Sequence, residues 1–436
     1  MLLSLQYLRG IASLLVVLYH ARGEISNVYA QSNLGELLFG NGYIGVDLFF
    51  MISGFVIMLS TEKDKSAFSF IIKRLFRIYP VYLVCLFVLV FIQDRPIDIN
   101  VIKSLFFVNL DLFSEAPWFG YTIIFTAWTL MFEIIFYILF YISLALSWKY
   151  RGYISMLLIS SIVLGTNFYF NGSVNFSGYS SIIISPNQEH SVMLGIARVF
   201  SSPMFFEFVI GIIIYKIYNS AKINISNDYI RIITIVSIAL FSYFYVTGYN
   251  GGHGPLNCGV YAALLLLALV LFEKTCKVKN SATLSYFGNI SYSLYLTHAL
   301  VMNILPTGII AGSLYSQAHG FSNLYLILLS SIFISTILYY TIELYFVKFA
   351  RLILNTTATK KNTSNLICEV IGAWVHKYVS IKILDTNKHT GFMRMEITPS
   401  SHKAMQQIQY LCSICNYRKK LFTHPRHLDA FLQQHL

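Results

Sequence analysis

Residues 42–60 read GYIGVDLFFMISGFVIMLS, and Asp47 is the only charged residue in this stretch. A transmembrane helix needs about 20 consecutive, mainly apolar residues, so the stretch predicts one membrane span. The whole chain has the same character, because 56% of its 436 residues are hydrophobic and only 11% are charged. Soluble domains carry roughly 25% charged residues, so this composition predicts an integral membrane protein.

Similar apolar stretches recur along the chain and predict an all-α polytopic membrane protein with about ten transmembrane helices. The first stretch lacks a basic leader and a small-residue cleavage site, so we expect a retained helix rather than a signal peptide. The predicted spans are 4–22, 42–60, 77–93, 118–146, 152–170, 203–219, 229–247, 255–272, 285–305 and 323–347.

Basic residues alternate between the connections of these spans. Lys and Arg gather in every second connection, at 63–77, 149–151, 216–231 and 274–279, and again after the last span at 348–351. Cytoplasmic connections carry an excess of Lys and Arg, so we expect both termini in the cytoplasm. Because many of the basic residues follow this alternation, the net charge of +12 does not call for a nucleic-acid partner.

The chain changes character at about residue 356. We expect a transmembrane domain at 1–355 and a basic cytosolic tail at 356–436, which holds six of the eleven His and three of the six Cys. Alternating apolar residues at 378–384 and 392–397 predict a short hairpin, and 404–422 is compatible with a helix. A zinc-like order of ligands occurs in the tail, at Cys412, Cys415, His424 and His427. The gaps between these residues are shorter than in a zinc finger. A coincidental spacing is the alternative interpretation, and no bound metal is expected.

Ionisable side chains occur inside the predicted spans, where each costs several kcal/mol unless it is paired or functional. Arg9 and His20 are eleven residues apart on the first span, about three helical turns, so they share a face at different depths. Asp47, Glu133 and His298 lie in other spans. One interpretation is a set of interior pairs that fix helix packing. The other is a His base with a carboxylate partner to orient it.

Lys73, Arg74 and Arg77 form a basic cluster before the third predicted span. Arg74 and Arg77 are three residues apart, so they are neighbours on one face of a helix. Two interpretations account for the cluster. Basic residues prefer cytoplasmic helix ends, and arginines also clamp phosphate-rich ligands. Pro80 is expected to kink or cap the start of this span.

Seven segments, in order along residues 1 to about 350, resemble the motifs of the acyltransferase-3 family of membrane O-acyltransferases. The chain departs from the family pattern at Thr129, where Ser is usual, at Lys73, which precedes the arginine pair, and at Tyr345, which replaces a Pro. None of these departures removes a side chain with obvious chemistry. The segments are LQYLRGIASLLVVLYH (5–20), GYIGVDLFFMISGFVI (42–57), FIIKRLFRIYPVYL (70–83), AWTLMFEIIFYILF (127–140), FFEFVIGIIIY (205–215), FGNISYSLYLTHALV (287–301) and YTIELYF (340–346).

The resemblance implies transfer of an acyl group from a cytoplasmic acyl-CoA to a hydroxyl group. The acyl group is most often acetyl, and the donor is then acetyl-CoA. The implied acceptors are sugars of bacterial surface polysaccharides or lipid-linked oligosaccharides, and the implied location is the bacterial cytoplasmic (inner) membrane. His20 is implied as general base, with Asp47 or Glu133 orienting its ring, while a covalent route through Ser53 stays open. The residues implied to bind substrate and acyl-CoA are Arg9, Arg74, Arg77, Trp128, Tyr292 and His298.

Two other classes of protein are compatible with intramembrane charges. A transporter or lipid-linked sugar flippase uses His, Asp and Glu as a proton relay, but it predicts internal repeats and broken helices in paired positions, which the sequence does not show. A receptor or scaffold would place its function in the tail. Removal of residues 356–436 would then abolish function, whereas a transmembrane enzyme would survive it.

Overall fold

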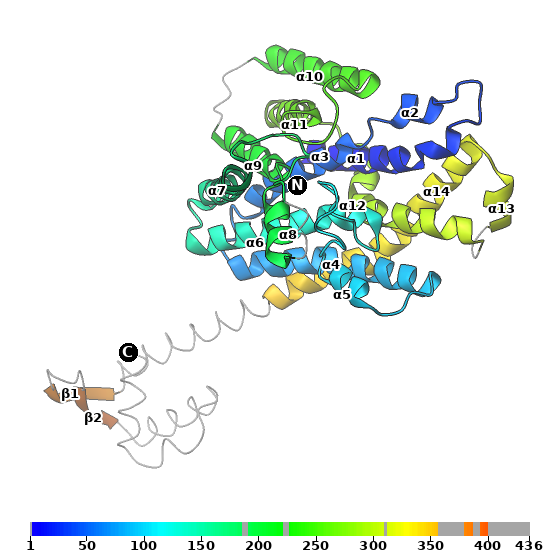
Figure 1. Cartoon of the computed structure of the whole chain (residues 1–436). Coiled ribbons are helices and arrows are strands. Elements are labelled where there is room, and N and C mark those ends of the chain that lie inside the picture. Colours follow the sequence, from blue (N-terminus) through cyan, green and yellow to red (C-terminus); the bar gives the residue numbers. More distant parts are fainter. Residues whose placement is uncertain are drawn as a thin grey trace. The chain divides into compact units, whose positions relative to one another are not determined.

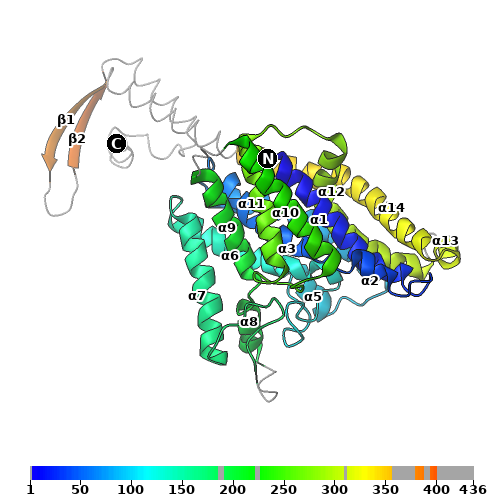
Figure 2. The ribbon, with the colours of Figure 1, turned by 90° about the horizontal axis from the view of Figure 1, so that it is seen from above.

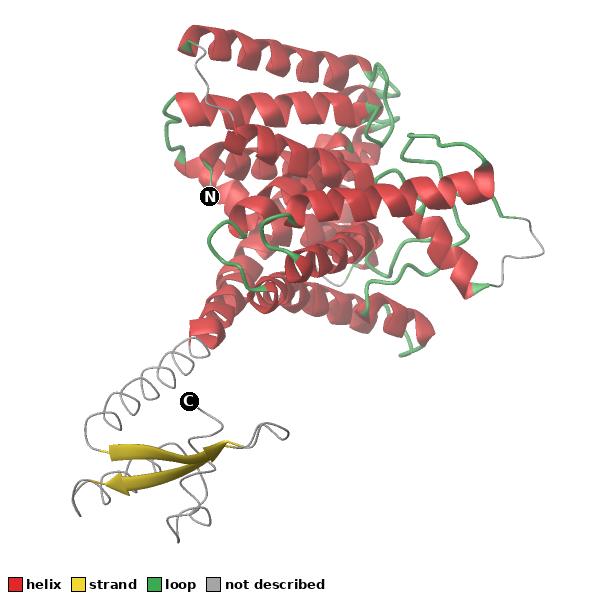
Figure 3. Cartoon of the chain, turned by 90° about the vertical axis from the view of Figure 1, so that its left-hand side faces the viewer, coloured by secondary structure: helices red, strands yellow, loops and turns green. Residues whose placement is uncertain are grey.

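The computed structural model describes residues 2–184, 191–220, 226–308, 312–355, 379–386 and 393–399. In the described ranges between residues 2 and 355, every regular element is a helix. These helices lie side by side in a bundle (Figures 1 and 3). The all-α architecture predicted for this part of the chain is therefore confirmed, while the cytoplasmic location of the termini stays a prediction.

Nine helical segments of the described ranges are long and apolar enough to cross a membrane, one fewer than the sequence predicted. The difference is the stretch 285–305. It forms the 23-residue helix α12 (Ala282–Ile304), which is not among the nine. Every residue of α12 from Leu294 to Val301 is buried. A helix enclosed by protein needs no apolar face for lipid, so it can carry the polar residues that function requires.

The other elements of the bundle include the long helices and several short ones in the connections. They are α1 (Leu3–Ala21), η1 (Arg22–Ile25), α2 (Leu34–Phe39), α3 (Ile44–Ser60), α4 (Ala67–Ile92), α5 (Ile99–Leu105), η2 (Phe125–Ala127), α6 (Trp128–Leu146), α7 (Arg151–Asn171), α8 (Val192–Phe200), α9 (Phe205–Ser220), α10 (Asn227–Thr247), α11 (Cys258–Thr275), η4 (Leu305–Thr307), α13 (Gly312–Gln317), α14 (Phe321–Leu338) and the π-helical turn η5 (Tyr339–Glu343).

Helix α1 packs against α12, α3, α11 and α14 (Figure 2). Glycines allow the closest of these approaches. A Cβ added to Gly10 of α1 would lie 2.8 Å from the backbone nitrogen of Gly288 in α12, and one on Gly54 of α3 would lie 2.2 Å from the Phe208 carbonyl oxygen in α9. Small residues at helix contacts are the usual device for close packing in membranes. They bring the polar side chains of α1 and α12 within reach of each other.

The third predicted span, 77–93, begins ten residues earlier than expected, because α4 starts at Ala67. The Ser66 hydroxyl accepts from the Ser69 backbone N–H at 3.2 Å and caps the helix. Pro80 lies inside α4 and neither starts nor ends it, so the capping role expected for Pro80 is wrong. Because α4 starts at Ala67, the basic cluster is part of a helix rather than of a connection.

The fourth predicted span is shorter than expected, since α6 begins only at Trp128.

The start of α1 is fixed by a residue far along the chain. No side chain next to the helix caps it. Instead the Glu273 carboxylate accepts from the backbone N–H groups of Leu3 and Ser4 at 2.7 and 2.8 Å. A carboxylate at a helix N-terminus satisfies free N–H groups and the positive end of the helix dipole. These two hydrogen bonds anchor the helix that carries Arg9 and His20.

The chain divides into two compact units, Met1–Ala350 and Arg351–Leu436. The second unit contains an antiparallel hairpin of β1 (Val379–Thr386) and β2 (Met393–Pro399), with Val379 opposite Pro399 and Thr386 opposite Met393. This confirms the predicted hairpin. The helix expected at 404–422 and the set Cys412, Cys415, His424 and His427 lie outside the described residues.

Candidate active site

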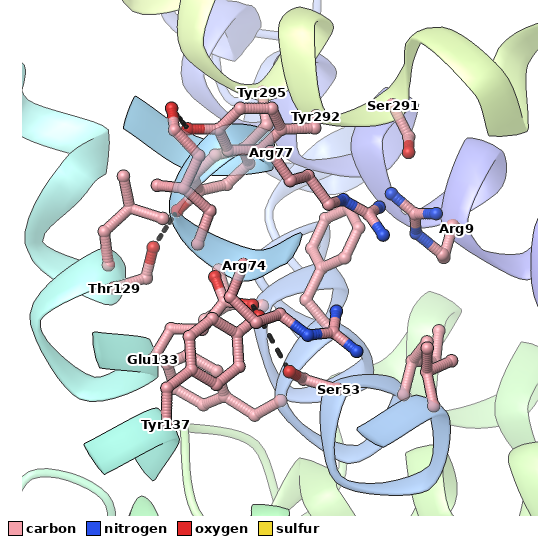
Figure 4. A pocket seen from close by; sticks show the side chains of 17 residues that line it. Arg9, Ser53, Arg74, Arg77, Thr129, Glu133, Tyr137, Ser291, Tyr292 and Tyr295 are labelled. Carbon is pink, nitrogen blue, oxygen red and sulfur yellow. Dashed lines mark hydrogen bonds between the residues drawn. The ribbon is translucent and has the colours of Figure 1, made fainter. Parts of the chain in front are cut away.

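A pocket opens between α1, α3, α4, α6 and α12, with about 760 Å³ of empty space including solvent at its mouth. Polar side chains from all five helices line it (Figure 4). The polar lining residues are Arg9, Ser53, Arg74, Arg77, Thr129, Glu133, Tyr137, Ser291, Tyr292 and Tyr295, and the apolar ones are Val46, Phe49, Phe50, Ile52, Val56, Ile78 and Leu130.

Three arginines converge on this pocket. Arg9 extends from α1, and Arg74 and Arg77 extend from α4 toward the same space (Figure 4). Among the described residues, none of the three guanidinium groups has a carboxylate oxygen within 4.0 Å. Arg74 is only 8% exposed and donates to the Ser60 hydroxyl at 3.1 Å. Three cations that share a pocket without a direct ion pair favour an anionic ligand, and guanidinium groups bind phosphate bidentately.

The third basic residue of the cluster does not join them. Lys73 is exposed and forms an ion pair with Asp64 at 2.5 Å. Burial opposes ionisation of the Asp64 carboxyl, but hydrogen bonds from Lys73 and Ser69 lower its pKa below the ordinary value. Helix α4 thus presents two arginines to the pocket and directs its lysine elsewhere. A preference for cytoplasmic helix ends explains Lys73, but it does not explain why the arginines line a pocket.

Glu133 lies on the pocket wall and does not contact His20. The hydroxyls of Ser53 and Tyr137 both donate to its Oε1, the former at 3.2 Å. The Arg74 guanidinium carbon lies 5.4 Å from the centre of the Tyr137 ring. This geometry ties Glu133 to the arginine side of the pocket. It does not support the expected role of Glu133 in orienting His20.

Helix α12 connects the pocket to a pair of histidines. Ser291, Tyr292 and Tyr295 line the pocket, and His298 follows one turn further along α12. The Tyr292 hydroxyl donates to the Ile78 carbonyl at 2.7 Å, and the Tyr295 hydroxyl donates to the Thr126 carbonyl at 2.9 Å. The Tyr295 ring lies 5.9 Å from the His298 ring. Tyr295 is therefore shared between the pocket wall and the histidine pair.

His20 and His298 are hydrogen-bonded, with Nδ1 of His20 3.2 Å from Nε2 of His298. His298 is fully buried, and its Nδ1 lies 3.1 Å from the Leu294 carbonyl oxygen. A carbonyl oxygen can only accept, so Nδ1 of His298 carries the proton and Nε2 of a neutral ring must accept. Nδ1 of His20, also 3.0 Å from the Val16 carbonyl, is then the donor. Nε2 of His20 is left without a proton and can act as a base.

Asp47 was expected to orient His20, but the structure pairs it with another histidine. Nδ1 of His253 lies 2.8 Å from its Oδ2, and the Gly254 backbone N–H donates to its Oδ1 at 3.1 Å. Asp47 is 0% and His253 is 4% exposed. A buried carboxylate of this kind needs such partners. In this structure the ring that contacts His20 is that of His298, and Asp47 holds His253, so the orienting role expected for Asp47 stays a prediction.

Sequence reasoning missed His253 because it lies in the connection between α10 and α11 rather than in a span. A signal was present in the surrounding GYNGGHGP (248–255), since clustered glycines allow unusual backbone conformations. Gly252 and Gly254 have φ of +91° and +124°, which residues with a side chain rarely adopt. Glu207 is also fully buried nearby, without a hydrogen-bond partner among the described residues. Glu207 lies near the start of the predicted span 203–219.

Trp128 was expected to contact substrate, and the structure places it at the Asp47–His253 pair instead. Its ring centre lies 5.9 Å from that of His253, and it is only 5% exposed. It is not among the residues that line the pocket. Its neighbour Thr129 does line the pocket and contacts the Tyr295 hydroxyl at 2.9 Å. Thr129 thus supplies a hydroxyl at the position where the resemblance expected Ser.

The fold and this site define a class of protein. A multi-pass membrane protein that joins a cationic pocket to a histidine with a free ring nitrogen has the parts of a group-transfer enzyme with an anionic donor. The comparison with known proteins gives the family. Residues 2–340 match the family model described as "Acyltransferase domain", and the chain belongs to this acyltransferase-3 family.

Named relatives agree with this assignment. The chain is 27% identical over 293 residues to the exopolysaccharide production protein ExoZ of Rhizobium meliloti (strain 1021), covering 64% of this chain and 83% of the relative. It is 26% identical over 345 residues to a provisionally named O-acetyltransferase of Staphylococcus aureus (strain COL), covering 71% and 52%. It is also 26% identical over 330 residues to O-acetyltransferase OatA of Staphylococcus aureus (strain NCTC 8325 / PS 47), covering 68% and 49%.

The chain thus spans most of the rhizobial relative but only about half the length of the staphylococcal ones. No solved structure matches it. The family and the O-acetyltransferase relatives together identify an acyltransferase, and the class of transporters and flippases is not favoured.

Proposed function

We propose that this enzyme moves an acetyl group from acetyl-CoA to a sugar hydroxyl of a surface polysaccharide or of a lipid-linked oligosaccharide. The observation that carries the proposal is the junction of two sites at Tyr295. On one side of Tyr295 lies the pocket with Arg9, Arg74 and Arg77, and on the other lies the His20–His298 pair. An acyl-CoA needs cationic groups for its phosphates and a base beside its thioester.

In this mechanism the arginines bind the phosphates of acetyl-CoA, and the pantetheine arm extends along α12 toward His20. Nε2 of His20 takes the proton of the acceptor hydroxyl while the hydroxyl oxygen attacks the thioester carbonyl carbon. The carbon–sulfur bond then breaks. The proton passes from His20 to the leaving sulfur, so the products are an acetyl ester and free CoA thiol. His20 thus acts first as the general base and then as the general acid.

His298 orients His20 in this proposal. Its Nε2 accepts the Nδ1 proton of His20, which keeps the lone pair of His20 on Nε2. Ser53 is not given a covalent role, because its hydroxyl donates to Glu133 rather than to a histidine. A serine nucleophile requires an adjacent base that accepts its proton, and a base already shared with Tyr137 fits this task poorly.

The acceptor class is supported by the names of the relatives. The rhizobial relative is named for exopolysaccharide production, and the staphylococcal relatives are named as O-acetyltransferases. We therefore propose a carbohydrate hydroxyl as the acceptor. Acetyl-CoA is a cytoplasmic metabolite, so the donor reaches the pocket from the cytoplasm. The proposed location is the cytoplasmic membrane of a bacterium.

The test is transfer of radiolabelled acetyl from acetyl-CoA by membranes that contain the full chain. Wild-type membranes are expected to release CoA thiol and to label glycan, which gains the mass of one acetyl group. His20→Ala is expected to lower the transfer rate by roughly 10²–10⁴-fold, since it removes the base. Lys73→Ala, which changes an exposed and ion-paired side chain, serves as the matched control. Wild-type rates in His20→Ala would refute the mechanism.

The same assay separates an enzyme from a flippase. A flippase moves a lipid-linked sugar across the membrane and leaves the thioester intact. Release of CoA thiol that requires both the protein and a glycan acceptor therefore identifies transfer. Its absence in wild-type membranes, with the protein correctly inserted, would reject the proposed function.

A further inference from the structure

A line of aromatic rings leads from the histidine pair to the exposed surface. From His20 the ring centres follow at 5.1 Å to Tyr19, 5.7 Å to Tyr43 and 5.0 Å to His253. Tyr179 lies 5.9 Å beyond His253. The Asp47–His253 pair is thus not isolated from the candidate base, because it lies between the base and the surface.

The line ends on three rings that we call the aromatic platform: Trp118, Tyr121 and Tyr179. The Trp118 ring centre lies 5.6 Å from that of Tyr179 and 6.1 Å from that of Tyr121, with the latter two planes inclined by 25°. Tyr121 is 39% and Tyr179 is 44% exposed. The three residues come from connections, not from spans, so their exposed faces are not required for contact with lipid tails.

The backbone beneath the platform is held in a fixed shape. The Leu110 N–H donates to the Tyr121 carbonyl at 2.7 Å, and the Asn109 side chain donates to the Trp118 carbonyl at 2.7 Å. Tyr121 has a φ of +57°, an uncommon conformation for a bulky residue. Such conformations persist where the surroundings enforce them and are often found at functional sites.

The second connection is fixed as well. The Gly178 N–H donates to the His253 carbonyl at 2.8 Å, which ties the segment with Tyr179 to the segment that holds the Asp47 partner. The two segments that carry the platform therefore present their rings on rigid supports. A rigid aromatic surface binds with little loss of conformational entropy.

We infer that the aromatic platform binds a pyranose ring of the acceptor glycan, next to the sugar whose hydroxyl reaches His20. One face of a pyranose presents C–H groups, which carry partial positive charge and pack on the negative face of an aromatic ring. Its hydroxyls point outward and stay in water or reach polar side chains, such as the exposed Glu115 in the segment between Trp118 and α5. A long glycan needs an open surface of this kind, unlike the enclosed pocket that suits the donor.

This inference rests on the proposed function and names the acceptor subsite within it. The alternative is that the three rings belong to an aromatic belt at the membrane interface, where Tyr and Trp are common. Belt residues act independently and have no reason to follow a line of contacts to the base. The continuity from Tyr121 to His20 favours the acceptor.

The test measures transfer by the full chain in membranes, with acetyl-CoA as donor and the two-ring glycosides methyl β-cellobioside, methyl β-lactoside or methyl α-maltoside, or glycerol, as acceptor. Tyr121→Ala and Tyr179→Ala are expected to raise the acceptor KM by roughly five- to tenfold, since each removes one stacking surface. The KM for acetyl-CoA is expected to stay within about twofold, because the donor pocket does not include these residues. Tyr121→Phe and Tyr179→Phe keep the ring and are expected to keep the acceptor KM.

Tyr169→Ala is the matched control, because Tyr169 is an 83% exposed tyrosine at the end of α7, outside the platform. A wild-type acceptor KM in both platform alanine variants would overturn the inference while leaving the proposed function intact. So would an equal effect of Tyr169→Ala, which would indicate a belt, or transfer to glycerol but to no pyranoside. Failure of wild-type protein to transfer acetyl to any of the acceptors would count against the proposed function itself.

Discussion

The Nε2 atom of His298 lies 3.2 Å from the Nδ1 atom of His20, and this contact joins helices that are 278 residues apart in sequence. Its consequence is a defined proton arrangement. Because Nδ1 of His298 faces the Leu294 carbonyl, the hydrogen bond between the rings directs the free lone pair of His20 to Nε2. In the proposed mechanism the histidine pair takes the place of a carboxylate–histidine pair, without a negative charge beside the proposed thioester.

His298→Ala is expected to lower kcat by about 10–100-fold, less than the loss of the base itself, because the His20 ring loses a contact that orients it while the Val16 carbonyl still accepts its Nδ1 proton. His298→Gln is expected to recover part of this loss, since its side-chain oxygen can accept the same proton. The measurement is the pH profile of transfer, with KM for acetyl-CoA in parallel. In every active variant the rate falls as the pH is lowered through the range where His20 takes up a proton. Equal loss in His298→Ala and His298→Gln would assign His298 a packing role.

Substitutions of the arginines and of the lysine of α4 are expected to have different effects on the KM for acetyl-CoA. Arg74→Ala and Arg77→Ala each remove charge-assisted hydrogen bonds, so the KM for acetyl-CoA is expected to rise about 10–100-fold. Lys73→Ala is expected to change it less than about twofold, because Lys73 pairs with Asp64 at the surface. Added salt is expected to weaken donor binding in wild type more than in either arginine variant. A rise in KM with Lys73→Ala equal to that of the arginine variants would show that net basic charge, not the pocket, binds the donor.

Much of this architecture is encoded locally. Apolar runs predicted the helices, and the spacing of Arg74 and Arg77 placed them on one face, as found at the pocket. The partners of the buried groups are not encoded in this way. That Asp47 bonds to His253 and His20 to His298 depends on which helices meet, through contacts 206 and 278 residues apart in sequence. Local patterns carry no information on such distant pairs.

Helix α12 shows a different limit. Hydropathy marks helices that face lipid, whereas α12 is enclosed between α1, α4 and α14. A helix in this position can be polar, so the property that identifies spans is weakest for the helix that carries Tyr292, Tyr295 and His298. The apolar stretch 285–305 predicted this helix, but as a membrane span, whereas α12 is not among the nine helical segments of the described ranges that are apolar enough to cross a membrane.

Loss of the Asp47–His253 pair is expected to lower the stability of the folded protein more than it lowers the rate of the chemical step. Asp47→Ala leaves His253 without its partner in a buried site, and breaking a buried pair costs about 3–5 kcal/mol. The expected result is a lower unfolding temperature of the detergent-solubilised protein and a smaller folded fraction. Glu36→Ala is the control, because the Arg22–Glu36 pair has a 61% exposed Glu side chain and exposed pairs contribute about 0–1 kcal/mol. If Asp47→Ala retained wild-type stability but lost transfer activity, the role in orienting the catalytic base that was expected for Asp47 would be supported instead.

Two glycines offer a test of the close helix packing that creates the site. A Cβ on Gly54 would lie 2.2 Å from the Phe208 carbonyl oxygen, so Gly54→Ala must push α3 away from α9. Overpacking of this kind costs about 1–3 kcal/mol, and the shift would also move Asp47 and Ser53, which lie on α3. Gly165 in α7 has nothing within 4 Å of an added Cβ. Gly165→Ala is therefore expected to leave stability unchanged or to raise it by about 0.5–1 kcal/mol, because Ala favours a helix. Thermal unfolding of both variants in the same detergent compares the two, and equal stability would show that α3 and α9 do not need their close approach.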